Sequence, residues 1–373
     1  MKGLPARAAA LILALGVGGL LAASSGLMPI KASSGHWAPT EWFLRFSMRR
    51  SIFTHSLLIK APAGLDDPAL ALKGARHFES ACRSCHGAPG LPPSPVARGM
   101  LPPPPELKAR VEGRRPRELF SVVKHGIKLT GMPAWPVPGR DDEVWAMVAF
   151  LRLLPELDEA GYRRLARPGA SPPPFPAPAA QACARCHGAD GSDLGSGAFP
   201  RLAGQPAEYL RGALEAYRDG RRHSGIMESA AAGLSAEAVR ELAEYFSGLP
   251  VVPGVPPKER DAQAIERGGR IARRGIPARK VPVCAACHGL ETKRSKDAYP
   301  ALAGQPAAYL VLQLELFKEG RRGGSAHAHL MEPVAEKLTP GEMRDAALFY
   351  ESLYLRKPDP PDPQGIDTTE GRL

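Results

Sequence analysis

The sequence predicts an all-α protein, built from three small tandem domains that follow an apolar N-terminal segment. Apolar residues recur at helical spacing along most of the 373-residue chain, without sustained alternation of apolar and polar residues. One short cysteine and histidine pattern occurs three times at a constant interval. Proline-rich stretches separate the copies, as expected for semi-rigid linkers between compact units.

Length and composition fit this interpretation. Compact domains cluster near roughly 100 to 150 residues, so the chain suits two or three of them. Hydrophobic residues make up 44% of the sequence and charged residues 23%, as in ordinary globular proteins. The formal net charge is +11, but the basic residues are spread along the chain and form no single block. We therefore expect no nucleic-acid partner.

The first 30 residues have the pattern of an export segment. Lys2 and Arg7 precede a mostly apolar run, as in signal peptides and membrane anchors. The stretch from Ala8 to Leu27 has about the 20 apolar residues that span a bilayer, whereas cleavage near residues 22–25 would make it a signal peptide. We favour the anchor, which places the rest of the chain on the periplasmic side of the membrane.

A juxtamembrane segment is expected next, because residues 31–64 mix aromatic side chains with arginines. Trp37 and Trp42 would suit an interfacial helix at the lipid headgroups. A helix packed on the first domain explains the same residues equally well. Both interpretations stay open at this stage.

The repeated pattern is Cys-x-x-Cys-His, and the first cysteines of neighbouring copies are 101 residues apart. Such an interval indicates tandem domains, not a solenoid. The copies contain all six cysteines: Cys82, Cys85 and His86; Cys183, Cys186 and His187; Cys284, Cys287 and His288. Cys-x-x-Cys-His is the attachment signature of c-type haem, in which both thiols bond one porphyrin and the histidine binds its iron. The sequence therefore predicts three covalently bound haem c groups.

Three other interpretations of these cysteines are less well supported by the sequence. A zinc site needs a second ligand pair close in sequence, and these pairs lie 101 residues apart. A thioredoxin-like dithiol expects a βαβ setting, which the sequence does not indicate. Disulfides suit an exported chain but leave the three trailing histidines unexplained.

A six-coordinate electron carrier needs a second axial ligand, and methionine is the choice that raises the potential. Each copy has a candidate downstream: Met132, Met227 and Met331. Nearby histidines are alternatives that would give bis-histidine ligation, although surface positions or contacts with haem propionates are expected for them: His125, His223, His327 and His329. Carbonyl groups of three prolines are expected to accept the other ring N–H of the motif histidines: Pro105, Pro200 and Pro300. Four further residues are candidates to pair with propionates, and simple surface positions explain them equally well: Tyr209, Arg222, Tyr309 and Arg322.

Helices and repeats give the domain organisation. Residues 199–210 match residues 299–310, and both stretches continue to Gly-Arg-Arg, so the second and third domains are close relatives. Each domain is expected to end in an amphipathic helix: Asp141 to Leu154, Ser235 to Leu249, and Thr339 to Tyr354. The expected divisions are 1–30 signal or anchor, 31–64 juxtamembrane segment, 65–166 domain 1, 167–180 linker, 181–250 domain 2, 251–262 linker, 263–357 domain 3, and 358–373 disordered tail.

One close helix crossing is predicted in the first domain. Gly74 lies within the expected helix from Leu70 to Ser80 and has no side chain, so it would allow the terminal helix with Trp145 and Phe150 to approach closely.

From Cys82 to the last terminal helix, the sequence resembles tandem mono-haem cytochrome c domains, the small all-α fold whose first and last helices cross over a haem. The second and third domains resemble the di-haem cytochrome c4 family through Cys-x-x-Cys-His-Gly, Pro-x-Leu-x-Gly-Gln, the distal methionine and the closing helix. The first resembles cytochrome domains that carry Gly-Met-Pro-Ala. One departure is that the linker runs almost directly into Cys183, so the first helix of the second domain must be short.

The resemblance implies a periplasmic electron carrier that is not itself an enzyme. Its expected partners are redox proteins, namely a terminal oxidase, a dehydrogenase or another cytochrome, together with the membrane. The alternative is a non-catalytic cytochrome subunit of a periplasmic dehydrogenase or oxidase complex.

Overall fold

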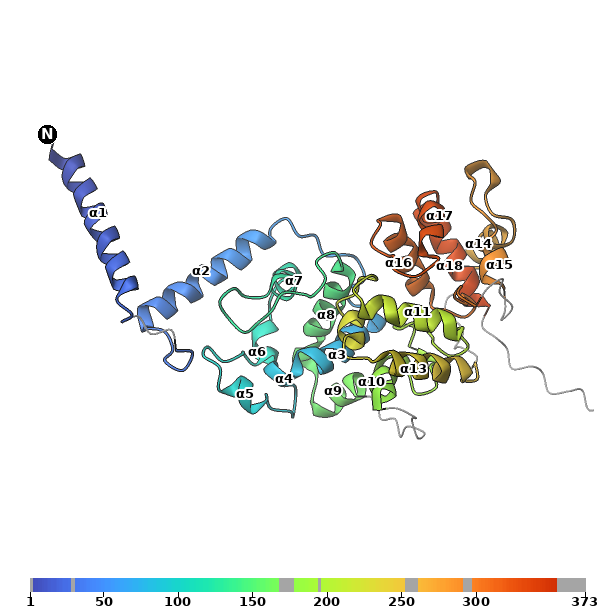
Figure 1. Cartoon of the computed structure of the whole chain (residues 1–373), viewed down its shortest axis with the longest axis horizontal. Coiled ribbons are helices and arrows are strands. Elements are labelled where there is room, and N and C mark those ends of the chain that lie inside the picture. The colour runs from blue at the N-terminus through green and yellow to red at the C-terminus, as the bar shows by residue number, and fades with distance from the viewer. Residues whose placement is uncertain are drawn as a thin grey trace, which may run out of the picture.

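The computed structural model describes residues 3–27, 31–167, 178–193, 196–251, 261–290 and 297–353. Regular structure in these ranges is helical, apart from two isolated bridges between extended residues, Ala88 with Leu91 and Ile276 with Val281. The prediction of an all-α fold is confirmed. Most of the two predicted linkers, and the whole predicted tail, lie outside the described residues. Figure 1 shows α1 and α2 leading into the remaining helices, with α14–α18 at the far end of the molecule from α1.

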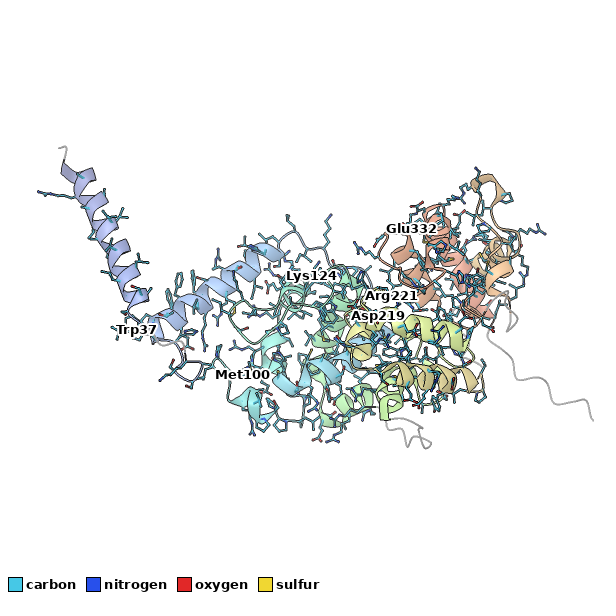
Figure 2. The ribbon with its side chains drawn as sticks, in the orientation of Figure 1. Trp37, Met100, Lys124, Asp219, Arg221 and Glu332 are labelled. Atoms are coloured by element: carbon cyan, nitrogen blue, oxygen red, sulfur yellow. The ribbon has the colours of Figure 1, made fainter. Side chains whose placement is uncertain are left out.

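Helix α1 (Gly3–Ser24) projects away from the rest of the chain (Figure 1). Its stretch Ala6–Ser24 is long and apolar enough to cross a membrane, although a signal sequence would pass the same test. Helix α2 (Ala38–Ser56) follows and packs on the first group near its end, where Ser56 is buried. Its start is exposed, with Trp37 at 79% (Figure 2). The end of α2 therefore packs on the first unit, as one of the two interpretations predicts, whereas an interfacial position of its start stays a prediction.

The first unit comprises the helices from α3 to α9. Their bounds are α3 (Pro68–Ala81), α4 (Arg83–His86), α5 (Pro95–Arg98), α6 (Leu107–Val111), α7 (Pro116–His125), α8 (Asp141–Leu153), η1 (Leu154–Glu156) and α9 (Glu159–Ala166). Helices α3 and α8 cross at Gly74, where an added Cβ would lie 2.1 Å from the Ala146 carbonyl oxygen and 2.8 Å from Cβ of Phe150. The predicted close approach is confirmed. Trp145, on the same helix, stacks on Phe120 of α7.

The second unit comprises α10 (Pro178–His187), α11 (Ala207–Arg218), α12 (Met227–Ala231) and α13 (Ala236–Gly248). Helix α10 ends in the Cys-x-x-Cys-His motif and has few residues before it, as predicted. Helix α13 packs mainly on α11, where Leu210, Leu242 and Phe246 form a buried cluster. The second unit therefore has no long N-terminal helix of its own in the described residues.

The third unit restores the crossing seen in the first. Its helices are α14 (Ala262–Arg274), η3 (Pro277–Arg279), α15 (Cys284–His288), α16 (Ala307–Lys318), η4 (Ala328–Leu330), α17 (Glu332–Glu336) and α18 (Pro340–Ser352). Helix α14 crosses α18 at Gly268, where an added Cβ would lie 1.9 Å from the Asp345 carbonyl oxygen. Thr339 and Glu342 form a capping box at the start of α18.

Candidate haem sites

The three motif histidines share one kind of hydrogen-bond partner, although His187 and His288 are buried and His86 is half-buried. Each ring Nδ1 lies at hydrogen-bonding distance from a proline carbonyl oxygen: His86 from Pro105 at 3.0 Å, His187 from Pro200 at 2.9 Å, and His288 from Pro300 at 3.0 Å. A carbonyl can only accept, so Nδ1 must donate, and Nε2 keeps its lone pair for a metal. The predicted histidine–proline pairs are confirmed.

A glycine follows each motif histidine and ends the short helix there. Gly87, Gly188 and Gly289 have φ of +67°, +81° and +69°, a region that favours glycine. At Gly87 a Cβ would also lie 2.9 Å from the Leu91 carbonyl oxygen. The chain can therefore turn directly after the histidine and bring the proline carbonyl to its ring.

The six motif cysteines are free thiols in the structure, with no disulfide among them. Burial raises the pKa of Cys82 to about 12, and it raises those of Cys183 and Cys284 to about 11. These thiols are therefore protonated at neutral pH. No group of three or more His, Cys, Asp and Glu residues in the described ranges is arranged to hold a metal ion.

Each candidate methionine lies in a loop or at the start of a short helix after its motif. Met132 lies in a turn where its carbonyl accepts from Ile127 N at 3.1 Å, and its own N–H donates to Thr130 at 3.2 Å. Met227 begins α12, and Met331 precedes α17 and packs against the buried cluster of the third unit. All three side chains belong to half-buried residues.

The alternative histidines differ in exposure. His125, His223 and His329 are exposed, which agrees with the expected surface positions. His327 is half-buried, and its ring lies 5.2 Å from that of Tyr299. The Tyr299 ring in turn lies 6.3 Å from that of His288.

Two arginines lie in the junction between the second and third units. Arg222 is 5% exposed and donates to Gln313 at 3.1 Å, and the Arg322 guanidinium donates to the Tyr209 hydroxyl at 3.3 Å. The ion pairs found in the described residues give neither arginine a carboxylate partner. Burial alone would raise the pKa of Tyr209, but the charges of Arg222 and Arg322 lower it to about 8.

Such a junction suits an anionic group. A desolvated guanidinium without a carboxylate is unfavourable unless an anion compensates it. Haem carries two propionates, so the donor set fits the cofactor that the cysteine motifs predict.

Two glutamines join the same units reciprocally, and the sequence reasoning missed them. Gln305 accepts from Arg201 N at 3.0 Å and donates to Arg201 O at 2.8 Å. Gln205 makes the equivalent bonds with Ala301, at 3.0 and 2.8 Å. Both glutamines occupy the same position in the repeated Gly-Gln motif. This repeat could have indicated the contact, because matching side chains of two related domains can pair symmetrically.

Comparisons with known proteins agree with this geometry. The family model described as "Cytochrome C oxidase, cbb3-type, subunit III" matches residues 69–151, and the cytochrome c model matches 178–249 and 279–353. The thiosulfate dehydrogenase electron acceptor of Stutzerimonas stutzeri is 34% identical over 219 residues, which cover 59% of this chain and 94% of that protein. The chain belongs to the cytochrome c family.

This multi-haem c-type cytochrome also resembles cytochrome c4. The cytochrome c4 of Pseudomonas aeruginosa is 32% identical over 178 residues, covering 47% of this chain and 85% of that one. A solved cytochrome c4 from Pseudomonas stutzeri is 28% identical, with a TM-score of 0.43, and its match covers 46% of this chain and 93% of that one. The predicted resemblance to the cytochrome c4 family is confirmed.

Proposed function

We propose that this cytochrome carries three covalently bound haem c groups and passes single electrons between redox protein partners. The observation that carries the proposal is the threefold pairing of a motif histidine with a proline carbonyl, which leaves three Nε2 atoms able to bind iron. When bound, haem iron supplies the one-electron chemistry. The haem domains in this proposal are residues 65–166, 181–250 and 263–357.

The residues of the chain have separate tasks. The six motif cysteines fix three porphyrins by thioether bonds, and the prolines orient the histidine rings. Met132, Met227 and Met331 are the second axial ligands. Arg222 and Arg322 hold propionates in the junction between the second and third units.

We place the protein on the periplasmic side of the inner membrane. Thioether attachment to exported cysteine motifs agrees with an export segment in α1, and the length of α1 suits an anchor. N-terminal sequencing of the mature protein decides between anchor and signal peptide. Retention of Ala8 to Leu27 is expected, and a mature chain that starts after them would contradict the anchor.

The haem count tests the main proposal. Pyridine haemochrome spectra and the intact mass of the purified protein should both give three haems per chain. Replacing both cysteines of a single motif by alanine should remove one haem and leave two. A colourless protein, or an unmodified mass, would refute the proposal.

A second candidate function is that of an electron-accepting subunit bound to a dehydrogenase. It is favoured by two relatives named thiosulfate dehydrogenase electron acceptor, from Stutzerimonas stutzeri and Thiomonas intermedia, the latter 37% identical over 178 residues. Purification from native membranes distinguishes the two. A catalytic subunit that co-purifies in equal amount would support the subunit role, and a chain recovered alone would support the free carrier.

A further inference from the structure

The first unit contacts the second beside the motif of the second unit. Arg76 on α3 is 3% exposed and donates from Nη1 to the carbonyl oxygen of Cys186 at 3.1 Å. Its guanidinium lies 5.1 Å from the centre of the Phe199 ring. That ring lies 6.1 Å from the His187 ring. An arginine of the first unit is therefore packed next to the proximal side of the second haem site.

A second contact joins the first unit to the loop before Met227. Glu143, near the start of α8, is 2% exposed. Its carboxylate accepts from the Ser224 hydroxyl at 2.5 Å, from Gly225 N at 2.8 Å and from Trp135 Nε1 at 3.1 Å. Two of the three donors belong to the second unit. The carboxylate of Glu143 thus lies buried between the units.

Ser224 connects Glu143 to Met227 through hydrogen bonds. Its hydroxyl has one proton, which it donates to Glu143, and its oxygen accepts from Met227 N at 3.0 Å. The Glu228 carboxylate accepts from Ser224 N at 3.0 Å. The start of α12, and with it the backbone of Met227, is therefore tied to a side chain of the first unit.

The fit around Glu143 is close, and Arg140 lies beside its carboxylate, although this guanidinium also pairs with Asp142 at 2.8 Å. A Cβ on Gly225 would lie 2.5 Å from Trp135 Nε1, so a larger residue could not pack there. Arg140 pairs with Glu143 at 3.0 Å and donates to the His223 carbonyl oxygen at 2.7 Å. Burial raises the pKa of Glu143, whereas Arg140 and the Ser224 hydroxyl oppose that rise.

We propose that Glu143 is a positioning residue for the second haem: acting through Ser224, it holds Met227 where its sulfur can bind the iron. The inference rests on the proposed role of Met227 as axial ligand. In the part of the chain that the structure describes, helix α10 is short and the second unit has no long crossing helix, unlike the first and third units with α3 and α14. Two residues of the first unit contact the second haem site instead: Arg76 on the side of the motif histidine and Glu143 on the side of Met227.

The test uses E143Q in the full-length holoprotein. Glutamine keeps the size of the side chain but replaces one acceptor oxygen by an NH₂ group, which then faces N–H or O–H donors. We expect the ferric protein to lose about one third of its methionine–iron charge-transfer absorption, since one of three such bonds weakens. The reduced protein should bind carbon monoxide at one haem per chain. Amide exchange of residues 224–228 should become about tenfold faster.

E79Q is the matched control. Glu79 is also a buried carboxylate of the first unit, but its partners Tyr162, Arg167 and Arg83 all belong to the first unit or its end. It should leave exchange at 224–228 unchanged and should not increase carbon monoxide binding at the second haem. If E79Q and E143Q have the same effects there, the inference is overturned.

S224A removes the hydroxyl through which Glu143 is connected to Met227, and so breaks the same connection from the side of the second unit. It should reproduce the spectral loss of E143Q, and the double variant should lose no more than either single variant, because both break one connection. Losses that add would overturn the inference, as would faster exchange with unchanged absorption. Failure of the proposed function looks different, because the wild-type protein would then lack the third haem or its methionine–iron absorption.

Discussion

At the scale of single residues, the proposed chemistry of each haem site depends on a motif histidine and a methionine that would both bind the iron. The histidines are oriented by the proline carbonyls. The methionines are set by backbone hydrogen bonds of their own loops, as for Met132 with Thr130 and Ile127. We propose ligation as the role of Met132, because its turn, between Gly131 and Pro133, is not the usual place of a core methionine.

Met132→Ala should therefore remove one methionine–iron charge-transfer band and lower the potential of the first haem, because a thioether ligand favours the reduced iron. A spectroelectrochemical titration measures both effects. Met48→Ala, on the exposed side of α2, is the control and should leave the band in place. An unchanged band in the Met132 variant would refute its assignment.

A buried histidine predicts how the first unit responds to acid. His77 is 7% exposed beside Trp135, and burial lowers its pKa to about 4. Between about pH 6.5 and pH 4 the unfolded chain binds a proton there that the folded chain excludes, so stability falls as the pH falls. The loss from this residue reaches about 3 kcal/mol at pH 4 and vanishes above pH 6.5.

His77→Phe replaces the ring by one that cannot titrate, so stability should depend less on pH between 4 and 6.5. Urea unfolding of both proteins at several pH values measures the difference. Equal pH dependence in the two proteins would show that His77 is not the group responsible.

At the scale of elements, the first and third units each depend on one helix crossing at a glycine. Because Cβ atoms at Gly74 and Gly268 would overlap carbonyl oxygens of the facing helix, the helices pack backbone to backbone there. Such close packing buries the facing sides of both helices, and in the first unit it places Cys82 directly after the end of α3.

Gly74→Ala should destabilise the first unit by about 1–3 kcal/mol, since the methyl group forces α3 and α8 apart. Gly212→Ala, in the middle of α11, is the control, because nothing lies within 4 Å of its added Cβ. That change should be neutral or stabilise by up to about 1 kcal/mol, because alanine favours the helix. Thermal unfolding of both variants, followed by circular dichroism, tests the contrast.

These elements were largely predictable from the sequence, but the contacts between units were not. The terminal helices end within two residues of their predicted bounds, because apolar periodicity and caps such as Thr339 are local signals. The histidine–proline pairs also follow from a short repeated motif. Glu143 and Ser224 are 81 residues apart, and no local pattern indicates that a glutamate of one unit will meet a serine of another.

At the scale of the whole molecule, the three units form one connected body. Gln205 and Gln305 join the second to the third, and Arg321 of the third unit donates to Gly139 of the first at 2.9 Å. Arg221, beside Asp219 at the end of α11 (Figure 2), donates to the Gly324 carbonyl of the third unit. Fixed contacts between haem domains keep the distances for electron transfer constant, which a chain of freely linked domains would not do.

Replacing Gln205 and Gln305 together by alanine should uncouple the second and third units. Each change leaves a backbone N–H and a carbonyl of the other unit buried without a partner, at a cost of about 1–3 kcal/mol for each group left unsatisfied. Thermal unfolding followed by calorimetry should therefore show the two units melting over a wider range than in the wild type. Gln263→Ala on α14 is the control, since that side chain is exposed and should have no effect. An unchanged transition in the double variant would mean that other contacts, such as those of Arg222 and Arg322, are sufficient to couple the two units.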